Sequence, residues 1–257
     1  MLLRDLIEKN KITKDLLKNV NNEILHNKVR GISSNSREIK KGYIFVAIKG
    51  KNFDGAEFIA EAEKLGAFLI IAEESYDKTV FSIKKGTARQ IYTLLLSSFY
   101  IKQPKQIIGV TGTNGKTSTV EFCRQLWALA GWKAASMGTL GTKTETVINK
   151  SIYKNKEENL TTFEPSDLYK KLNFLVEEKI SHLALEASSH GIDQYRLDGV
   201  NFSGAVFTNL SHDHLDYHGN TANYFSTKKR LFTKVLKNNS AISINIDDIY
   251  GKKLYEE

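Results

Sequence analysis

The chain of 257 residues has one cysteine, two prolines and no apolar run long enough to cross a membrane. A single cysteine, Cys123, excludes the internal disulfide framework that stabilises many small secreted domains. The first five residues, Met-Leu-Leu-Arg-Asp, form an amphipathic start rather than a secretory leader. We therefore expect a cytosolic protein without membrane contact.

The scarcity of proline makes its positions informative. Pro104 lies in Ile-Lys-Gln-Pro-Lys, between a helical pattern and a β-branched run, where a domain boundary is expected. The length suffices for two modest domains with their own cores. We predict one domain over residues 1–103 and a second over 104–257.

Basic residues exceed acidic ones, with 37 Lys and Arg against 29 Asp and Glu and a formal charge of +8. Residues 1–103 hold 18 basic and 12 acidic residues, and the remainder holds 19 and 17. No zinc pattern, aromatic RNA-binding string or helix-turn-helix spacing accompanies the surplus. We expect lysines on solvated faces and no nucleic-acid partner. A basic first domain that helps to hold a highly anionic small molecule stays open.

Hydrophobic periodicity predicts an α/β protein. The first domain reads as a small mixed α/β unit, with helices at 2–9, 56–65 and 87–100 and strands at 43–48 and 68–71. The second alternates more cleanly, with strands at 106–110, 182–186, 204–208 and 241–246 and helices at 116–130, 165–179 and 221–236. Such alternation predicts a mostly parallel sheet with helices on both faces and ligands at the carboxyl ends of its strands.

A glycine-rich segment, Gly-Thr-Asn-Gly-Lys-Thr at residues 112–117, follows the 106–110 strand and precedes a helix. Glycines let the backbone turn its amides toward an anion, Lys116 supplies positive charge, and the Thr117 hydroxyl can hold Mg²⁺. The strict P-loop pattern needs glycine at position 110, where Val110 stands. We interpret the segment as a variant phosphate cradle rather than an ordinary turn.

Polar residues follow two other strands of the predicted sheet. Glu186 ends one of them, and the string Thr-Asn-Leu-Ser-His-Asp-His at residues 208–214 follows another. A carboxylate beside a phosphate loop is a typical Mg²⁺ partner, because hard cations prefer oxygen ligands. The alternative is that Glu186 caps a turn.

The segment His-Asp-His-Leu-Asp-Tyr-His at residues 212–218 has a second interpretation. It comes close to the H-x-H-x-D-H string of di-zinc hydrolases, but Tyr217 is one residue too many. A zinc hydrolase would also leave the glycine-rich cradle unexplained. A surface loop rich in histidine is a further alternative.

Together these strings resemble the Mur ligase family, and within it the branch that forms the tripeptide of the peptidoglycan precursor. The resemblance covers the whole chain and rests on these segments: Ser36-Arg37, residues 42–47 and 50–55, the cradle at 112–117, Thr161-Thr162, residues 186–191, residues 208–219, and residues 224–232. The cradle alone would also fit folylpolyglutamate synthetases.

The resemblance implies a set of site residues. The uridine end of a UDP-sugar would be held by Ser34, Ser36, Lys51, Asn52 and Phe53. The muramoyl-dipeptide part would be held by Thr161, Thr162, Ser188, Gln194 and Arg196. The ATP phosphates would be held by Gly112, Thr113, Asn114, Gly115, Lys116, Thr117 and Ser118.

The resemblance also implies two Mg²⁺ ions. Thr117 and Glu186 would serve one, and His214 and Lys228 the second, with Lys228 carried as a carbamate (N6-carboxylysine). By composition alone Lys228 would be one of three solvated charges on a helix, beside Lys229 and Arg230. With Lys116, these residues Glu186, His214 and Lys228 form the implied catalytic set.

The implied reaction is an ATP-dependent amide ligation in peptidoglycan precursor synthesis. Its substrates would be UDP-MurNAc-L-Ala-D-Glu and an amino acid, with meso-diaminopimelate favoured over lysine, and its enzyme a monomer. Family members run for nearly as many residues again, so the second domain is expected to be incomplete at its C-terminal end. A fragment, a split gene product and a decayed copy are all compatible with this. A P-loop phosphohydrolase and a non-catalytic UDP-sugar-binding remnant stay open as functions.

Overall fold

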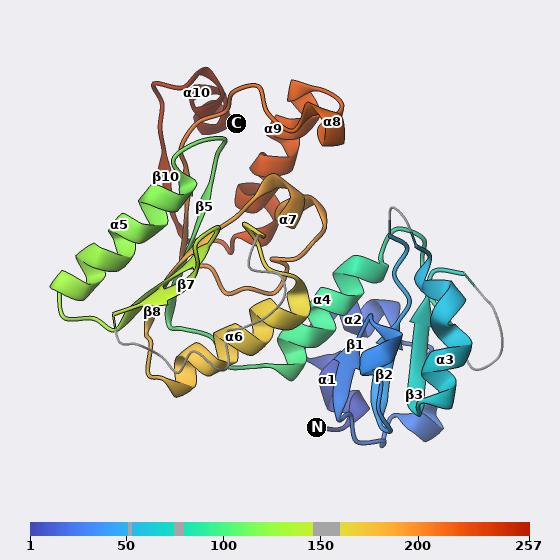
Figure 1. Cartoon of the computed structure of the whole chain (residues 1–257). Coiled ribbons are helices and arrows are strands. Elements are labelled where there is room, and N and C mark those ends of the chain that lie inside the picture. The colour runs from blue at the N-terminus through green and yellow to red at the C-terminus, as the bar shows by residue number, and fades with distance from the viewer. Residues whose placement is uncertain (51–52, 75–79, 146–159) are drawn as a thin grey trace. The chain divides into compact units, whose positions relative to one another are not determined.

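The computed structural model describes residues 1–50, 53–74, 80–145 and 160–257 (Figure 1). The chain divides into two compact units, Met1–Ile101 and Lys102–Glu257. The division lies next to Pro104, beside the expected boundary near residue 103. Within the described ranges, no helix is both long and apolar enough to cross a membrane.

The first unit is built on a four-stranded parallel sheet in the order β1-β2-β3-β4. Its strands are β1 (Gly31–Ser33), β2 (Tyr43–Val46), β3 (Ala67–Ala72) and β4 (Val80–Ser82). Its helices are α1 (Leu3–Glu8), α2 (Lys11–Leu16), α3 (Ile59–Lys64) and α4 (Ala88–Phe99), with 3₁₀ turns η1 (Asn22–Ile24), η2 (Ser36–Glu38) and η3 (Gly55–Phe58).

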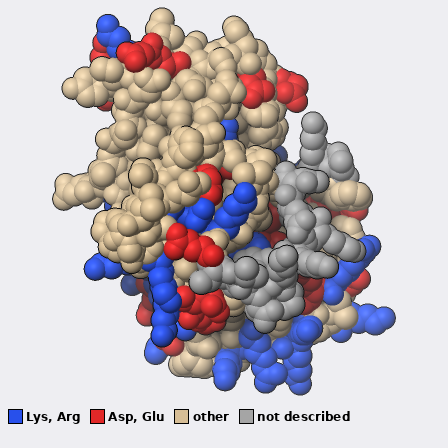
Figure 2. Space-filling view, turned by 60° about the vertical axis from the view of Figure 1, so that its left-hand side comes forward, with Lys and Arg blue, Asp and Glu red and all other residues tan. Residues whose placement is uncertain are grey.

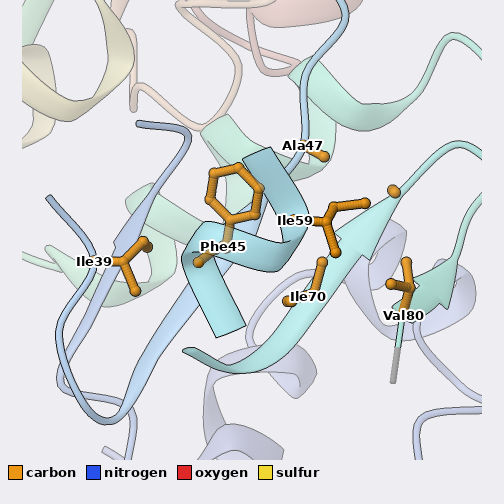
Figure 3. Packing of buried hydrophobic residues seen from close by; sticks show 8 residues of the cluster. Ile39, Phe45, Ala47, Ile59, Ile70 and Val80 are labelled. Atoms are coloured by element: carbon orange, nitrogen blue, oxygen red, sulfur yellow. The ribbon is translucent and has the colours of Figure 1, made fainter. Parts of the chain in front are cut away.

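One face of this sheet packs against α3. Figure 3 shows Phe45 of β2 and Ile70 of β3 beside Ile59 of α3, with Ile39 and Val80 at the margins of the same cluster. Phe45 is fully buried. Alternating apolar residues on short parallel strands therefore supply the core of the first unit.

The second unit has a six-stranded sheet in the order β10-β9-β5-β8-β6-β7. All pairs are parallel except the hairpin of β6 with β7. The strands are β5 (Gln106–Thr111), β6 (Ala134–Gly138), β7 (Gly141–Thr144), β8 (His182–Glu186), β9 (Gly204–Phe207) and β10 (Ala241–Ile244). The mostly parallel sheet that the alternating pattern predicted is thus confirmed.

Helices cover both faces of this sheet (Figure 1). Val120 of α5 packs on Val110, Ala184 and Val206 from one face, whereas Phe207 points to the other face and packs on Phe225. The helices are α5 (Lys116–Leu129), α6 (Pro165–Glu177), α7 (Ser189–Asp193), α8 (Leu215–His218), α9 (Thr221–Arg230) and α10 (Ile249–Glu256).

Several boundaries differ from the sequence prediction. The helix expected over 221–236 is α-helical only to Arg230, and Leu231–Val235 forms a π-helical turn. The last strand ends at Ile244 rather than at 246. The first turn of the 56–65 helix is 3₁₀. The pattern also missed short elements, among them β1, β4, β6, β7, α2, α7, α8 and α10, since a run of three to eight residues shows little periodicity.

The parallel register brings the polar strand ends to one edge of the sheet. Val110 of β5 pairs with Glu186 of β8, and Thr111 pairs with Phe207 of β9. The glycine-rich segment, Glu186 and the 208–214 string therefore leave the sheet side by side. This is the edge at which the candidate site lies.

Candidate active site

The cradle is a tight turn between β5 and α5. Gly112 and Gly115 have φ angles of 148° and 83°, which residues other than glycine rarely adopt. A Cβ on Gly112 would lie 1.9 Å from the Thr208 hydroxyl oxygen. The backbone of the cradle thus touches the segment after β9, and glycine at 112 is a steric requirement.

Asn209 holds the cradle in shape. The Asn114 amide donates to the Asn209 side-chain oxygen at 2.9 Å, and the Thr113 amide donates to the Asn209 carbonyl at 2.9 Å. The Asn209 side-chain nitrogen donates to the Asn114 carbonyl at 3.2 Å. The expectation that successive amides of the cradle face an anion is therefore wrong for Thr113 and Asn114, whose amides are used internally.

The amides that remain for a phosphate begin at Gly115. The Thr119 amide bonds back to the Gly115 carbonyl at 2.9 Å, whereas those of residues 115–118 lie in the first helical turn, where the helix offers no acceptor. The positive end of the helix dipole adds to their attraction for an anion. The first-turn amides of Lys116, Thr117 and Ser118 are therefore available to an anion, as the predicted phosphate cradle requires.

The Lys116 ammonium folds back over the cradle. Its Nζ donates to the Gly112 carbonyl at 2.9 Å and to the Thr113 carbonyl at 2.7 Å. Burial lowers the pKa of Lys116, while the charges of Glu186 and Asp213 oppose that shift. The ammonium is therefore held close to the first-turn amides.

Lys228 of α9 reaches the same carbonyl. Its Nζ donates to the Gly112 carbonyl at 2.8 Å and lies 4.5 Å from the centroid of the Tyr224 ring. The side chain is 1% exposed, so the alternative of a solvated helix charge is wrong for Lys228. Desolvation, followed by the charge of Lys116, lowers its pKa to about 7.

Glu186 is buried at the end of β8. Its Oε1 accepts from the Thr139 amide at 2.9 Å, and its Oε2 accepts from the Thr139 hydroxyl at 3.3 Å. The side chain lies over Gly138, where a Cβ would come within 2.0 Å of Oε1. The turn-capping role is thus present, and it leaves lone pairs on a carboxylate beside the cradle.

A polar group next to β8 contains the residues expected to hold a muramoyl-dipeptide. The Thr162 hydroxyl accepts from the Ser188 amide at 2.9 Å and donates to the Glu186 carbonyl at 2.9 Å. Arg196 donates to the Thr162 carbonyl at 2.7 Å. Further bonds join Arg196 to Gln194 and to Glu164, and Thr161 to Thr139. The structure brings this predicted set together.

His214 is the N-cap residue directly before α8 and adopts the left-handed region, with φ of 53°, and its Nε2 lies 3.4 Å from Asp213. The His190 ring lies 4.9 Å from the His214 ring, edge to face. His218 is buried, and its Nε2 has no hydrogen-bond partner among the described residues. Burial lowers the pKa of His190 and of His218, and the neighbouring histidine charges add to the shift.

The described ranges contain no group of three His, Cys, Asp or Glu side chains that could hold a metal. The di-zinc alternative therefore gains no support from the histidine-rich segment. A hard cation would instead need hydroxyl and carboxylate oxygens, and Thr117 and the buried Glu186 flank the cradle with such oxygens. These donors fit Mg²⁺ beside a phosphate.

The uridine-binding candidates lie in the first unit. Ser36 begins η2 and is 5% exposed, Ser34 is half-buried, and Phe53 is 71% exposed. Lys51 and Asn52 lie outside the described residues. These positions stay predictions.

Two family models match the chain. The Mur ligase middle domain matches residues 110–257, and the model described as Mur ligase family, catalytic domain, matches residues 28–93. The chain belongs to the Mur ligase family. The sequence resemblance is thereby confirmed at the level of the family.

Individual relatives agree with this. A UDP-N-acetylmuramoyl-L-alanyl-D-glutamate–2,6-diaminopimelate ligase of Brucella melitensis is 41% identical over 231 residues, which are 89% of this chain and 46% of that protein. A solved ligase of the same name superposes with a TM-score of 0.78 at 26% identity, covering 100% of this chain and 49% of its own. The chain spans about half the length of these relatives.

A more distant structure shares the fold. The MurF ligase of Thermotoga maritima, solved in complex with ADP, gives a TM-score of 0.55 at 24% identity and covers 88% of this chain and 48% of its own. The Mur ligase fold therefore holds at low sequence identity.

Sequence reasoning missed three residues of the site. Asn209 and Thr139 act through loop contacts at long sequence separation, 95 and 47 residues from their partners. The Tyr224 hydroxyl lies 3.3 Å from the Thr113 hydroxyl. Asn209 and Tyr224 lie in segments that carry the family resemblance, 208–219 and 224–232, but neither was assigned a role.

Proposed function

We propose that this chain supplies the ATP-phosphate and muramoyl-dipeptide sites of an ATP-dependent ligase in peptidoglycan precursor synthesis. The ligase adds meso-diaminopimelate to UDP-MurNAc-L-Ala-D-Glu, and it works in the cytosol. One observation carries the proposal: the Lys116 and Lys228 ammonium groups share the Gly112 carbonyl beside the buried Glu186 and the Thr162–Arg196 group.

Two ammonium groups that share one carbonyl favour the binding of an anion. The unit holds Lys116 and Lys228 within hydrogen-bond distance of a single acceptor, although like charges repel strongly in a site of low dielectric. A polyphosphate bound to the first-turn amides would relieve that repulsion. This arrangement supports ATP as the ligand of the cradle.

The same crowding supports carbamylation of Lys228. Burial and the neighbouring Lys116 favour the neutral amine, whose Nζ can attack the carbon of CO₂. The new N–C bond displaces a C=O electron pair onto oxygen, and Nζ loses one proton to water. The product is an anionic carbamate that removes the repulsion with Lys116.

Ligation through an acyl phosphate would use the charged and polar groups of the candidate site. A substrate carboxylate oxygen attacks the γ-phosphorus of ATP, ADP leaves, and the acyl carbon becomes electrophilic. The incoming amine then attacks that carbon, and phosphate leaves as the tetrahedral intermediate collapses. Lys116 stabilises charge on the transferring phosphoryl group, while Arg196 orients the substrate. Mg²⁺, when held by Thr117 and Glu186 and by His214 and the Lys228 carbamate, neutralises phosphate charge.

Calorimetry separates this function from its competitors. We expect the chain to bind both UDP-MurNAc-L-Ala-D-Glu and Mg·ATP, and to leave a nonspecific oligonucleotide unbound. Hydrolysis of ATP without affinity for the UDP-sugar would favour a P-loop phosphohydrolase. Affinity for the UDP-sugar without affinity for ATP would favour a non-catalytic binding remnant. Binding of the oligonucleotide alone would refute the proposal.

Carbamylation of Lys228 has its own readout. With ¹³C-bicarbonate, the protein is expected to show a carbamate carbon signal in NMR that disappears in Lys228→Ala. Lys229→Ala is the matched control, since Lys229 pairs with Glu257 at the helix surface and should keep the signal. A signal that survives Lys228→Ala and disappears in Lys229→Ala would place the carbamate on Lys229 and contradict the proposal. No signal in the parent protein would remove the carbamate.

A further inference from the structure

Tyr217, the third residue of α8, joins two segments of the site that no assigned role yet connects. Its hydroxyl donates to Asp193 Oδ2 at 2.8 Å and accepts from Gln194 Nε2 at 3.4 Å. Asp193 ends α7, and Gln194 follows it directly. A single phenolic oxygen therefore joins α8 to the last residue of α7 and to the first residue of the segment that follows it.

That segment carries the residues proposed to hold the muramoyl-dipeptide. The Gln194 side-chain oxygen accepts from Arg196 Nη2 at 2.8 Å and from Arg196 Nε at 3.2 Å. Arg196 in turn donates to the Thr162 carbonyl. The Tyr217 hydroxyl thus bonds to the same amide side chain that orients the guanidinium.

The ring of Tyr217 contacts the other side of the site. Its centroid lies 4.1 Å from the His190 ring, and the His190 ring lies 4.9 Å from that of His214. The Tyr217 amide also donates to the His214 carbonyl at 3.1 Å. Tyr217 therefore contacts His214, both directly and through His190, and His214 is proposed to bind the second Mg²⁺ ion.

Packing does not require the hydroxyl. The ring of Tyr217 is 39% exposed, and the α7 segment has an independent anchor, because Arg230 donates to the Ile192 carbonyl and pairs with Asp198 through two bonds. Loss of the hydroxyl should therefore leave the α7 segment folded. What changes is the relative position of Gln194 and His214.

We propose that Tyr217 is a positioning residue that couples the muramoyl-dipeptide site to the Mg·ATP site. The inference rests on the proposed function, since it needs both ligands to bind. A ligand that orders Gln194 and Arg196 also fixes Tyr217 and, through it, His214. By linkage, each ligand should then strengthen the binding of the other by the same factor.

The test measures that factor by calorimetry on the whole chain. The affinity for UDP-MurNAc-L-Ala-D-Glu is determined with and without a saturating Mg²⁺ complex of a non-hydrolysable ATP analogue, and the reciprocal titration closes the cycle. We expect a coupling factor of about 3–10 in the parent chain, the range set by one net hydrogen bond. In Tyr217→Phe the factor should fall to about 1, while each ligand alone keeps its affinity within about twofold.

Tyr255→Phe is the matched control, because it removes the hydroxyl of a tyrosine that is 74% exposed on α10. This variant should keep the parent coupling factor. An unchanged factor in Tyr217→Phe, or the absence of coupling in the parent chain, would overturn the inference while leaving the proposed function intact. Failure of the parent chain to bind either ligand would instead overturn the proposed function itself.

Discussion

The two units share a parallel sheet but differ in what they bury. In the described part of the first unit, the buried polar side chains are all hydroxyls: Thr13, Ser33, Ser36, Thr93 and Ser98. In the described part of the second unit, the buried set includes the charged residues Lys171, Glu186, Arg196, Asp198 and Lys228. Among the described residues, only those of the second unit therefore carry charges in a medium of low dielectric.

Buried charge costs several kcal/mol per ion unless partners compensate for it. Asp198 is compensated by Arg230 at 2.7 Å, Arg196 by Glu164 at 2.6 Å, and Glu186 by the Thr139 amide. The Lys228 ammonium donates to the Gly112 carbonyl and lies over the Tyr224 ring, and the charge of Asp213 offsets only part of the desolvation that lowers its pKa. A buried charge without a paired carboxylate at hydrogen-bond distance in the described contacts of Lys228 thus lies at the cradle, where a polyanion is proposed to bind.

Net charge follows the opposite distribution. The surplus of basic residues belongs mainly to residues 1–103, and in the described part of that range no Lys, Arg, Asp or Glu is buried. In Figure 2, basic and acidic side chains lie near one another over much of the visible face, with broad areas that carry neither. The basic surplus and the buried charges of the candidate site therefore belong to different units of this chain.

Because each unit has its own core, we expect an apolar truncation in the first unit to destabilise that unit alone. Phe45→Ala removes a fully buried ring and should cost about 3–5 kcal/mol there. Hydrogen exchange of first-unit peptides measures the loss. Trp127 and Trp132, the two tryptophans of the chain, both lie in the second unit, so their fluorescence reports that unit alone. Phe53→Ala, at a 71% exposed ring, is the control with little expected loss of stability. Equal destabilisation of both units would show that they unfold cooperatively and would contradict this prediction.

The second prediction concerns charge at the cradle. Lys116→Ala should weaken Mg·ATP binding by about 100-fold, because a preorganised charge is worth this much in a partly desolvated site. Calorimetry measures the affinity, and Lys234→Ala, which removes an exposed lysine after α9, should leave it unchanged. Equal affinity in Lys116→Ala and the parent chain would mean that the cradle does not bind phosphate through this lysine.

The smallest expected effect is a pH-dependent change in the free energy of unfolding, caused by a substitution on α5. Glu121 accepts from Arg124 at 2.6 and 3.0 Å and from the Ser136 hydroxyl at 3.0 Å, and the Arg124 hydrogen bond lowers the pKa of Glu121 to about 2. A carboxyl whose pKa is lower in the folded state than in the unfolded state stabilises the fold at pH values above its unfolded pKa of 4.5. This stabilisation is lost as the pH falls toward the folded pKa of about 2. Glu121→Gln should therefore cost about 2 kcal/mol at pH 7.

Urea unfolding followed by tryptophan fluorescence measures that cost. The difference between Glu121→Gln and the parent chain should shrink as the pH falls from 5 toward about 2. Glu256→Gln, at an exposed position of α10, is the control and should show little difference at any pH. A cost that stays constant with pH would show that the carboxylate charge is not its source.

Features that are encoded in a short stretch of residues could be predicted from the sequence. The run Ile107, Ile108 and Val110 forms a strand because β-branched residues pack well on a pleated surface, and the glycines after it permit φ angles closed to other residues. The family motifs likewise lie in short windows. The sheet edge could be inferred from them, because parallel strands end at the same edge.

What only the tertiary structure decided is which groups meet. Lys116 and Lys228 lie 112 residues apart in the sequence and bond one carbonyl, Asn209 uses two amides of the cradle, and Thr139 holds Glu186. Lys228, Lys229 and Arg230 are equivalent by composition, yet only the packing of α9 buries the first of them. Residue types determined what this chain can do locally, whereas long-range packing determined which charges lose their water and so acquire altered chemistry.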